Sequence, residues 1–333
     1  MTREPDSPGA DERIVAWLRA AGGPISGEEL ARRLGCSRAA VWKRIATLRR
    51  RGYRIEGRRA GGYALAAVPD RLGPAELAPY LRGAWRRVHW HEEVDSTQRV
   101  ARELADAGAP EGTTVIAERQ TAGRGRLGRV WHSPPGLNLY CSILLRPPLP
   151  PHAVPQVALV AGTAVAAAVA AQSTATPAIK WPNDVLVGGR KVAGILVEMD
   201  SEMERVRHVL VGIGVNLNAP AAAFPRQLRA KATSLLVATG RRVDRAAFAG
   251  RLLAELEARY GRYLSGGFAS VRTEWESWSC LGGRDVCVAG PEGEVSGRVL
   301  GLDDDGALRL AAPDGGVVRI VAGEVTVRDG YRS

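Results

Sequence analysis

The chain has 333 residues, of which 45% are hydrophobic and 24% are charged, and this composition is ordinary for a soluble globular protein. Its length predicts two or three domains. It has no uncharged apolar run of about 18 residues that would span a bilayer, and its polar N-terminus lacks the apolar segment of a signal peptide. The four cysteines show no metal-type spacing. We therefore expect a reduced, cytoplasmic, multidomain protein.

The net charge of +11 is concentrated in one short stretch. Between Arg32 and Arg59 there are eleven basic residues and a single acid, Glu56. A basic footprint this dense is typical of a protein that binds a phosphate backbone.

The first 66 residues predict a winged helix-turn-helix. Ser26 and Ser37 each precede a helical segment and are suited to cap it, and Gly35 forms the turn between the two helices. The expected elements are helices over Arg13–Ala21, Gly27–Leu34 and Arg38–Arg51, then strands over Tyr53–Glu56 and Gly62–Leu65.

Several residues of this region are candidate DNA contacts. Arg38 and Ala39 begin the third helix, where side chains of a recognition helix reach base edges. Phosphate contacts are expected from Lys43 and Arg44 on that helix and from Arg58 and Arg59 at the tip of the wing. The alternative is a small helical domain with a solvated basic face that binds protein.

A central region, residues 67–280, opens with a linker and a short helix. A strand is expected over His89–Val94, followed by a helix that runs to Ala107. Ser96 and Thr97 fall where the strand gives way to the helix, so their hydroxyls and the free N–H groups can bind a polar ligand. The simpler alternative is that they only cap the helix.

A glycine- and arginine-rich loop follows the next expected strand, Thr113–Glu118. Gly123-x-Gly125-x-x-Gly128 matches the dinucleotide fingerprint, but no helical period and no ribose-binding acid follow it. A protein kinase is excluded because H-R-D and D-F-G segments are missing. The glycines let the backbone approach a ligand, and the interleaved arginines are suited to phosphate oxygens.

The chain has only four lysines, and two of them, Lys180 and Lys191, lie within twelve residues of each other in a short motif-rich segment. Lysine is a compact point charge suited to a carboxylate or phosphate in a tight site. Asn183 and Asp184 lie between them and could hold a divalent cation, orient Lys191, or simply form an Asx turn. The expected elements here are a buried strand over Leu137–Leu145, a buried helix over Val154–Ala171, strands on either side of Pro182, a hairpin at Gly188-Gly189 with a return strand Lys191–Glu198, and a strand over Val209–Asn218.

The last segment, residues 281–333, alternates short apolar stretches with turn signals such as Asp304-Asp305-Gly306. Short strands at this spacing predict a small β-barrel.

The three motifs Gly123–Gly128, Lys180–Asp184 and Arg190–Gly194 occur in the order and spacing of the biotin protein ligases. With the N-terminal domain included, the chain resembles a bifunctional biotin protein ligase and biotin operon repressor. The resemblance implies an α+β multidomain fold: a winged helix-turn-helix (1–66), a ligase core with a mixed sheet like that of class II aminoacyl-tRNA synthetases (67–280), and an SH3-like barrel (281–333).

The resemblance also implies the chemistry. Biotin is activated with ATP and Mg²⁺ as biotinyl-5′-adenylate, and the acyl group passes to a lysine of the biotin carboxyl carrier protein domain of acetyl-CoA carboxylase. Biotinyl-AMP is then the corepressor of a homodimer that binds operator DNA. Two departures from the family pattern are Gln98, where asparagine is frequent, and Leu127, where a third arginine is frequent.

Roles for the site residues follow from the resemblance, position by position. The implied catalytic residues are Lys191, Arg124, Arg126 and Asp184, with Asp184 also the candidate Mg²⁺ ligand. Biotin contacts are implied for Ser96, Thr97, Gln98, Gln120, Arg124, Gly125, Arg126, Lys191 and Gly194, and nucleotide contacts for Trp131, Asn183, Gly214 and Asn216.

Three alternatives remain open at this point. One is a ligase of the same fold whose DNA-binding domain regulates nothing, and another is a lipoate-type acyl ligase. The third is a ligand-sensing regulator without catalytic turnover, which the intact Lys191, Arg124 and Arg126 disfavour.

Overall fold

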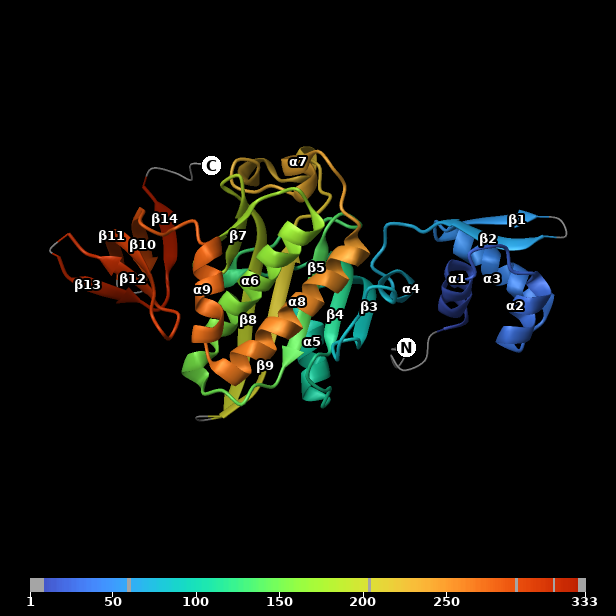
Figure 1. Cartoon of the computed structure of the whole chain (residues 1–333), viewed down its shortest axis with the longest axis horizontal. Helices are drawn as coiled ribbons and strands as arrows, with labels where there is room; N and C mark the ends of the chain where they lie inside the picture. The colour runs from blue at the N-terminus through green and yellow to red at the C-terminus, as the bar shows by residue number, and fades with distance from the viewer. Residues whose placement is uncertain (1–8, 59–60, 203–204, 291–292, 314, 329–333) are drawn as a thin grey trace. The chain divides into compact units, whose positions relative to one another are not determined.

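A computed structural model of the chain describes residues 9–58, 61–202, 205–290, 293–313 and 315–328. The chain divides into two compact units, Met1–Tyr80 and Leu81–Ser333, whose elements are labelled in Figure 1.

The first unit contains the predicted helix-turn-helix and wing. Ser26 accepts a hydrogen bond from the Glu29 amide at 3.1 Å and Ser37 accepts one from the Ala40 amide at 3.2 Å, so both predicted caps are confirmed. The elements are α1 (Ala10–Ala20), α2 (Gly27–Leu34), α3 (Arg38–Arg50), β1 (Arg54–Arg58), β2 (Gly62–Ala67) and the short α4 (Pro74–Leu77).

Helix α1 begins three residues earlier than predicted. The Glu12 carboxylate accepts a hydrogen bond from the Gly9 amide at 2.7 Å, which satisfies a free donor at the helix start. The sequence prediction counted only the apolar residues and missed this polar start.

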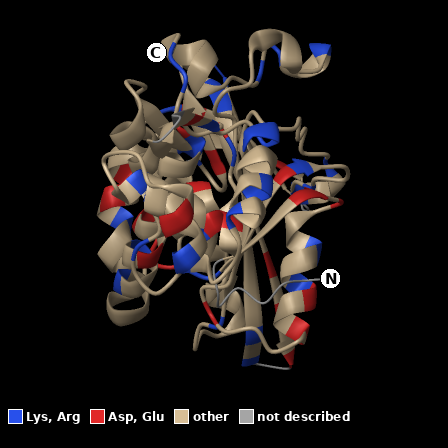
Figure 2. Cartoon of the chain, turned by 90° about the vertical axis from the view of Figure 1, so that its right-hand side faces the viewer, with Lys and Arg blue, Asp and Glu red and all other residues tan. Residues whose placement is uncertain are grey.

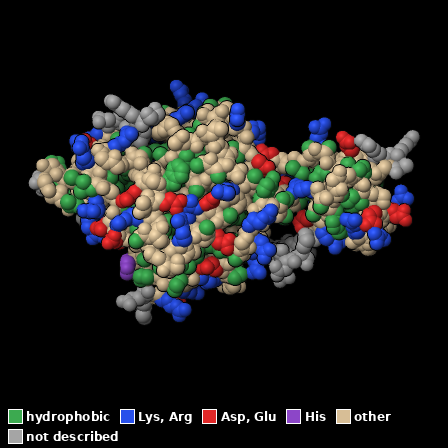
Figure 3. Space-filling view, in the orientation of Figure 1, with side chains coloured by type: hydrophobic (Ala, Val, Ile, Leu, Met, Phe, Trp, Pro, Cys, Tyr) green, Lys and Arg blue, Asp and Glu red, His purple; other side chains and the backbone are tan. Residues whose placement is uncertain are grey.

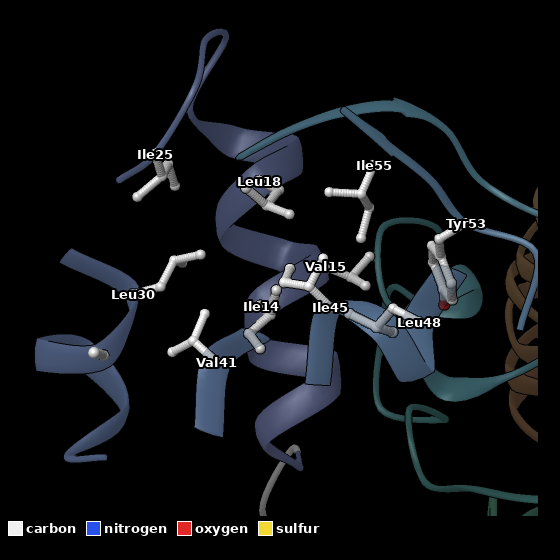
Figure 4. Close-up of a cluster of buried hydrophobic side chains, with 11 residues drawn as sticks. Ile14, Val15, Leu18, Ile25, Leu30, Val41, Ile45, Leu48, Tyr53 and Ile55 are labelled. Carbon is white, nitrogen blue, oxygen red and sulfur yellow. The ribbon is translucent and has the colours of Figure 1, made fainter. Parts of the chain in front are cut away.

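Apolar side chains from the three helices and the wing form one core, shown in Figure 4. Ile14 and Val15 of α1 pack with Val41 and Ile45 of α3, and Ile55 adds the wing strand. Gly62 has φ +85, and a Cβ there would lie 2.3 Å from the Ile25 carbonyl oxygen, so the wing needs glycine at this position.

The second unit is built on a seven-stranded mixed sheet with the order β3-β4-β5-β9-β8-β7-β6, in which only β3 and β4 are parallel. Its strands are β3 (Val88–Val94), β4 (Thr114–Gln120), β5 (Leu139–Leu145), β6 (Pro177–Lys180), β7 (Asp184–Val187), β8 (Arg190–Glu202) and β9 (Arg205–Val215). The prediction ran the last strand to Asn218, but the strand ends at Val215, and beyond it the Asn216 and Asn218 side-chain amides donate to the Thr233 and Val243 carbonyls.

Helices cover this sheet on both faces. Helix α5 (Thr97–Asp106) packs on Val115, Leu144 and Leu210, and residues alternate between faces along a strand. Helix α6 (Pro155–Gln172) contacts Ile179, which the strand register places on the other face.

Helix α6 is long and apolar enough to cross a membrane, but 78% of its most apolar window is buried inside the protein. The predicted buried helix is therefore confirmed. The sequence analysis did not predict α7 (Leu235–Thr239), α8 (Arg245–Gly266) and α9 (Ala269–Trp278), although α8 packs along α6.

A second, five-stranded antiparallel sheet follows with the order β13-β12-β11-β10-β14. Its strands are β10 (Asp285–Gly290), β11 (Gly293–Leu302), β12 (Leu308–Ala311), β13 (Val317–Ile320) and β14 (Glu324–Val327). The buried Trp181 indole, from the Lys180–Asp184 motif, donates to the Gly306 carbonyl at 3.1 Å. This bond ties the C-terminal sheet to the motif.

Candidate functional site

The site is floored by glycines on the face of the sheet that also carries α5. Gly194 of β8 lies directly opposite Gly214 of β9, and Gly212 is opposite Leu196 on the same face. A Cβ at Gly214 would lie 2.5 Å from the Trp131 ring, and one at Gly194 would lie 3.1 Å from it. Only glycine at these positions leaves room for a planar group to lie against the strands.

A buried network of polar side chains closes one end of this floor. The Gln120 carbonyl oxygen accepts from the Thr97 amide at 2.9 Å and lies 3.1 Å from the Thr97 hydroxyl. That hydroxyl is also 2.8 Å from the Ser142 hydroxyl, which donates to the Gln98 carbonyl oxygen at 2.8 Å. The Gln98 amide donates to the Leu210 carbonyl at 3.2 Å, which fixes its orientation.

The other end of the floor is charged. Lys191 Nζ pairs with Asp184 Oδ1 at 2.6 Å and lies 5.4 Å from the centre of the Trp131 ring. Lys180 lies opposite Asp184 in the register of β6 and β7, and burial lowers the pKa of its ammonium. The two rare lysines and one carboxylate are therefore in one cluster, as the sequence suggested.

The Gly-Arg loop lies over the charged end and contacts the C-terminal sheet. Arg126 donates to the Asn183 side-chain oxygen at 3.0 Å and to the Gly323 carbonyl at 3.4 Å. Arg129 forms a bidentate ion pair with Glu324 of β14. The loop contains only a 3₁₀ turn, Arg126–Gly128, in agreement with the rejection of a dinucleotide-binding helix.

Not every predicted residue lies in this cluster. Arg124 is exposed, and its backbone bridges to Val130 across the loop. The Asn216 side chain is buried and bonds the Thr233 carbonyl at 3.1 Å and the Asn138 side chain at 3.4 Å. The Ser96 side chain accepts a hydrogen bond from the Gln98 amide and so caps α5, as the simpler alternative predicted.

Three residues of the site were missed by the sequence analysis. Ser142 lies mid-strand in β5 and Ser133 follows Trp131, where its hydroxyl accepts from Gln120 at 3.0 Å. Glu324 comes from the C-terminal sheet and lies 195 residues from its partner Arg129 in the sequence. No local pattern in the sequence marks any of these three, because they reach the site only through tertiary pairing.

Asp184 is the one carboxylate of this cluster that could contact a Mg²⁺ ion. Among the described residues no group of three acidic, histidine or cysteine side chains forms a metal cage. Asp184 Oδ1 is buried and has no well-oriented hydrogen-bond donor in the described part of the chain, with Lys191 as its counterion. A single carboxylate fits an ion that arrives on a triphosphate and keeps several waters.

The candidate DNA-binding side chains lie on the outer face of α3. Arg38, Ala39, Lys43 and Arg44 are all exposed, and Arg44 is paired with Asp11 at 2.9 Å. Arg58 ends β1, but its side chain and the whole of Arg59 fall outside the described residues. Basic and acidic residues are interspersed along the ribbon in Figure 2, and their side chains are interspersed over the face shown in Figure 3.

Three family models match the chain, each over one part. They are the HTH domain over residues 11–64, the biotin/lipoate A/B protein ligase family over residues 90–216, and the biotin protein ligase C terminal domain over residues 281–328.

Whole-chain relatives and solved structures agree with these matches. The bifunctional ligase/repressor BirA of Bacillus subtilis is 42% identical over 87% of this chain and 90% of its own, and that of Escherichia coli is 32% identical over 95% and 96%. A structure of the Aquifex aeolicus biotin protein ligase in complex with biotin and ATP has a TM-score of 0.63 at 32% identity, covering 73% of this chain and 98% of its own. The chain therefore belongs to the biotin protein ligase family, among its bifunctional ligase/repressors.

Proposed function

We propose that this protein is an ATP-dependent biotin–protein ligase and a DNA-binding repressor of biotin genes. The observation that carries the ligase function is the glycine floor, which has a neutral polar network at one end and the Lys191–Asp184–Arg126 cluster at the other. A site of this kind suits a ligand with a polar, uncharged head and a carboxylate, as biotin has. Cations at the carboxylate end then suit the α-phosphate of ATP.

The activation step joins two anions. A biotin carboxylate oxygen attacks the α-phosphorus, the bond to the bridging oxygen breaks, and pyrophosphate leaves with that electron pair. Lys191 and Arg126 hold the carboxylate and phosphate oxygens together and offset the charge that develops. Mg²⁺, when bound with ATP beside Asp184, supplies further positive charge to the phosphate oxygens.

The second step transfers the acyl group. The neutral amine of a carrier-protein lysine attacks the carbonyl carbon, AMP leaves with the electron pair of the broken C–O bond, and the nitrogen releases one proton to solvent to give the amide. The acyl-adenylate hydrolyses in water, so the Gly-Arg loop, held by Arg129 and Glu324, serves to exclude solvent. The carrier partner is the biotin carboxyl carrier domain of acetyl-CoA carboxylase.

We further propose assignments of individual residues. Thr97 and Gln120 hold the biotin head, with Ser96, Gln98, Gly125 and Gly194 as the remaining biotin contacts. Trp131 packs on the adenine, while Asn183, Gly214 and Asn216 complete the nucleotide site. Arg124 joins the catalytic cations only when the loop closes over ligand, because its side chain is exposed in this state.

The regulatory function rests on the helix-turn-helix. We propose that the biotinyl-AMP-bound protein binds operator DNA as a homodimer, because two-fold operators match two-fold proteins. We also propose a cytoplasmic location, where ATP and chromosomal DNA are found. The proposed functional domains are 1–66, 67–280 and 281–333, although α4 (Pro74–Leu77) lies in the first compact unit.

A single-turnover experiment tests the ligase. The purified protein is incubated with ATP, Mg²⁺ and either biotin or lipoate, and both pyrophosphate release and retained acyl-adenylate are followed. Formation of biotinyl-AMP with lipoate inert is the expected result. Adenylation of lipoate in preference to biotin would reassign the substrate, and no adenylate from either acid would leave only a sensor.

A further inference from the structure

The outer face of α3 carries an aromatic residue that the sequence analysis did not consider. Trp42 is 61% exposed, although its neighbours Val41, Ile45 and Leu48 are buried in the core. Single exposed apolar residues are common, so exposure alone means little. Its position matters more, because it lies one turn after Arg38 and Ala39 on the same face of the helix.

The basic residues around it fall into two groups. Arg32 and Arg33 are paired with Glu29, Arg44 and Arg51 with Asp11, Arg49 with the Ile55 carbonyl, and Arg50 with Thr47. Within the described part of α2 and α3, only Arg38 and Lys43 make no such side-chain contact. These two cations are the ones that flank Trp42.

We propose that Trp42 is a specificity-determining residue of the repressor, and that its indole contacts a thymine methyl group in the major groove of the operator. This inference rests on the repressor function proposed above. The recognition helix of a helix-turn-helix lies in the major groove with its first turns toward base edges. Thymine is the one base that presents a methyl group there, and apolar side chains read it.

The neighbouring residues complete this assignment. No described residue is a side-chain partner of the Arg38 guanidinium, which is suited to a guanine edge, or of the Lys43 ammonium, which is suited to phosphate. Ala39, beside the indole, has only a methyl side chain, so the helix can approach the bases closely at this point. The arginines paired with protein groups contribute to the positive electrostatic potential of the domain, but their side chains are already bound to other residues of the protein.

The test uses the full-length protein with biotin, ATP and Mg²⁺, and duplexes selected from a random-sequence library by binding to it. Each thymidine of the selected site is then replaced by deoxyuridine, which removes only the methyl group. We expect the wild type to lose affinity, about three- to tenfold, at one thymine position in each half-site. In Trp42→Ala, specific binding falls and this methyl dependence disappears.

Lys43→Ala is the matched control on the same helix. It is expected to weaken specific and random duplexes alike, to reduce the slope of log affinity against log salt by about one, and to keep the methyl dependence. Trp42→Phe keeps an apolar aromatic side chain, so this variant is expected to retain part of the dependence on the thymine methyl group. Since Trp42 lies outside the core, its variants are expected to unfold at the wild-type temperature.

The outcomes separate the inference from the function beneath it. An unchanged deoxyuridine profile in Trp42→Ala, with wild-type operator binding intact, would overturn the inference and leave the repressor standing. Failure of the wild-type, ligand-bound protein to select any sequence would overturn the repressor function itself.

Discussion

Lys191 is the residue to which we assign the most direct role in the proposed ligase chemistry. Its ammonium is held by Asp184 at 2.6 Å and lies over the glycine floor, where the carboxylate and α-phosphate are proposed to meet. We expect Lys191→Ala to slow biotinyl-AMP formation by about 10²–10³-fold, because it removes a preorganised cation. Single-turnover formation of the adenylate measures this rate.

Lys231→Ala is a suitable control for that substitution. Lys231 is exposed, and its contact with Lys191 is made by its backbone carbonyl, which alanine keeps. Near-normal adenylation by Lys191→Ala, or an equal loss in Lys231→Ala, would contradict the assigned role.

Ser142 joins Thr97 to Gln98 in the polar network, and its hydroxyl is fully buried. Ser142→Ala leaves the Gln98 carbonyl oxygen without its donor, at a cost of about 1–3 kcal/mol. We expect the KM for biotin to rise about tenfold while kcat and the KM for ATP change little, because the network lies at the neutral end of the site. Steady-state kinetics with each substrate varied in turn distinguish this from a general loss of folding.

Glu76 carries a pH dependence of stability. Burial raises the pKa of its carboxyl, and the Tyr53 hydroxyl donates to it. A folded-state pKa above the unfolded value means that folding is favoured below the unfolded pKa and loses stability as pH rises through the folded one. We therefore expect Glu76→Gln to be more stable than wild type at pH 8, with a smaller difference at pH 4, in urea unfolding of both proteins. A larger advantage at pH 4 would contradict this.

At the scale of elements, strands β8 and β9 create the site by carrying glycines at matching register positions. Gly214→Ala places a methyl group 2.5 Å from the Trp131 ring, so either the indole or the strand must move. We expect adenylation to fall at least tenfold, since misplacement of about 1 Å has that order of effect. Gly261→Ala in α8 is the matched control: no atom lies within 4 Å of its Cβ, and it should stabilise the helix by about 0.5–1 kcal/mol.

At the scale of the whole molecule, the C-terminal sheet contacts the candidate active site. Glu324 binds Arg129, the Gly323 carbonyl accepts from Arg126, and Trp181 bonds to Gly306. Glu324→Gln breaks an exposed ion pair that is worth at most about 1 kcal/mol to stability. We expect unchanged thermal unfolding and faster release of biotinyl-AMP, because the loop is less firmly held. Retention of the adenylate on a rapid gel-filtration column measures this, and unaltered retention would show that the pair does not hold the loop.

Much of this protein is determined by local sequence patterns. The helices of the first unit follow from caps at Ser26 and Ser37, a turn at Gly35 and an apolar stripe, all of which act within a few residues. The order of the three ligase motifs indicated the family, and the rarity of lysine marked Lys191. Helices α8 and α9 were not predicted, although Asp244 caps α8 by accepting a hydrogen bond from the Ala247 amide.

Only the tertiary structure decided how these pieces meet. The pairing of Gly194 with Gly214, the bridge from Thr97 through Ser142 to Gln98, and the contact of Arg129 with Glu324 all join residues distant in sequence. Strand register sets which side chains share a face, and no local signal specifies it. The sequence therefore determined which chemical groups the protein has and which family it resembles. The packing of the two sheets brings the Asn183 side chain and the Gly323 carbonyl within hydrogen-bonding distance of Arg126. Arg124, on the same loop, stays exposed.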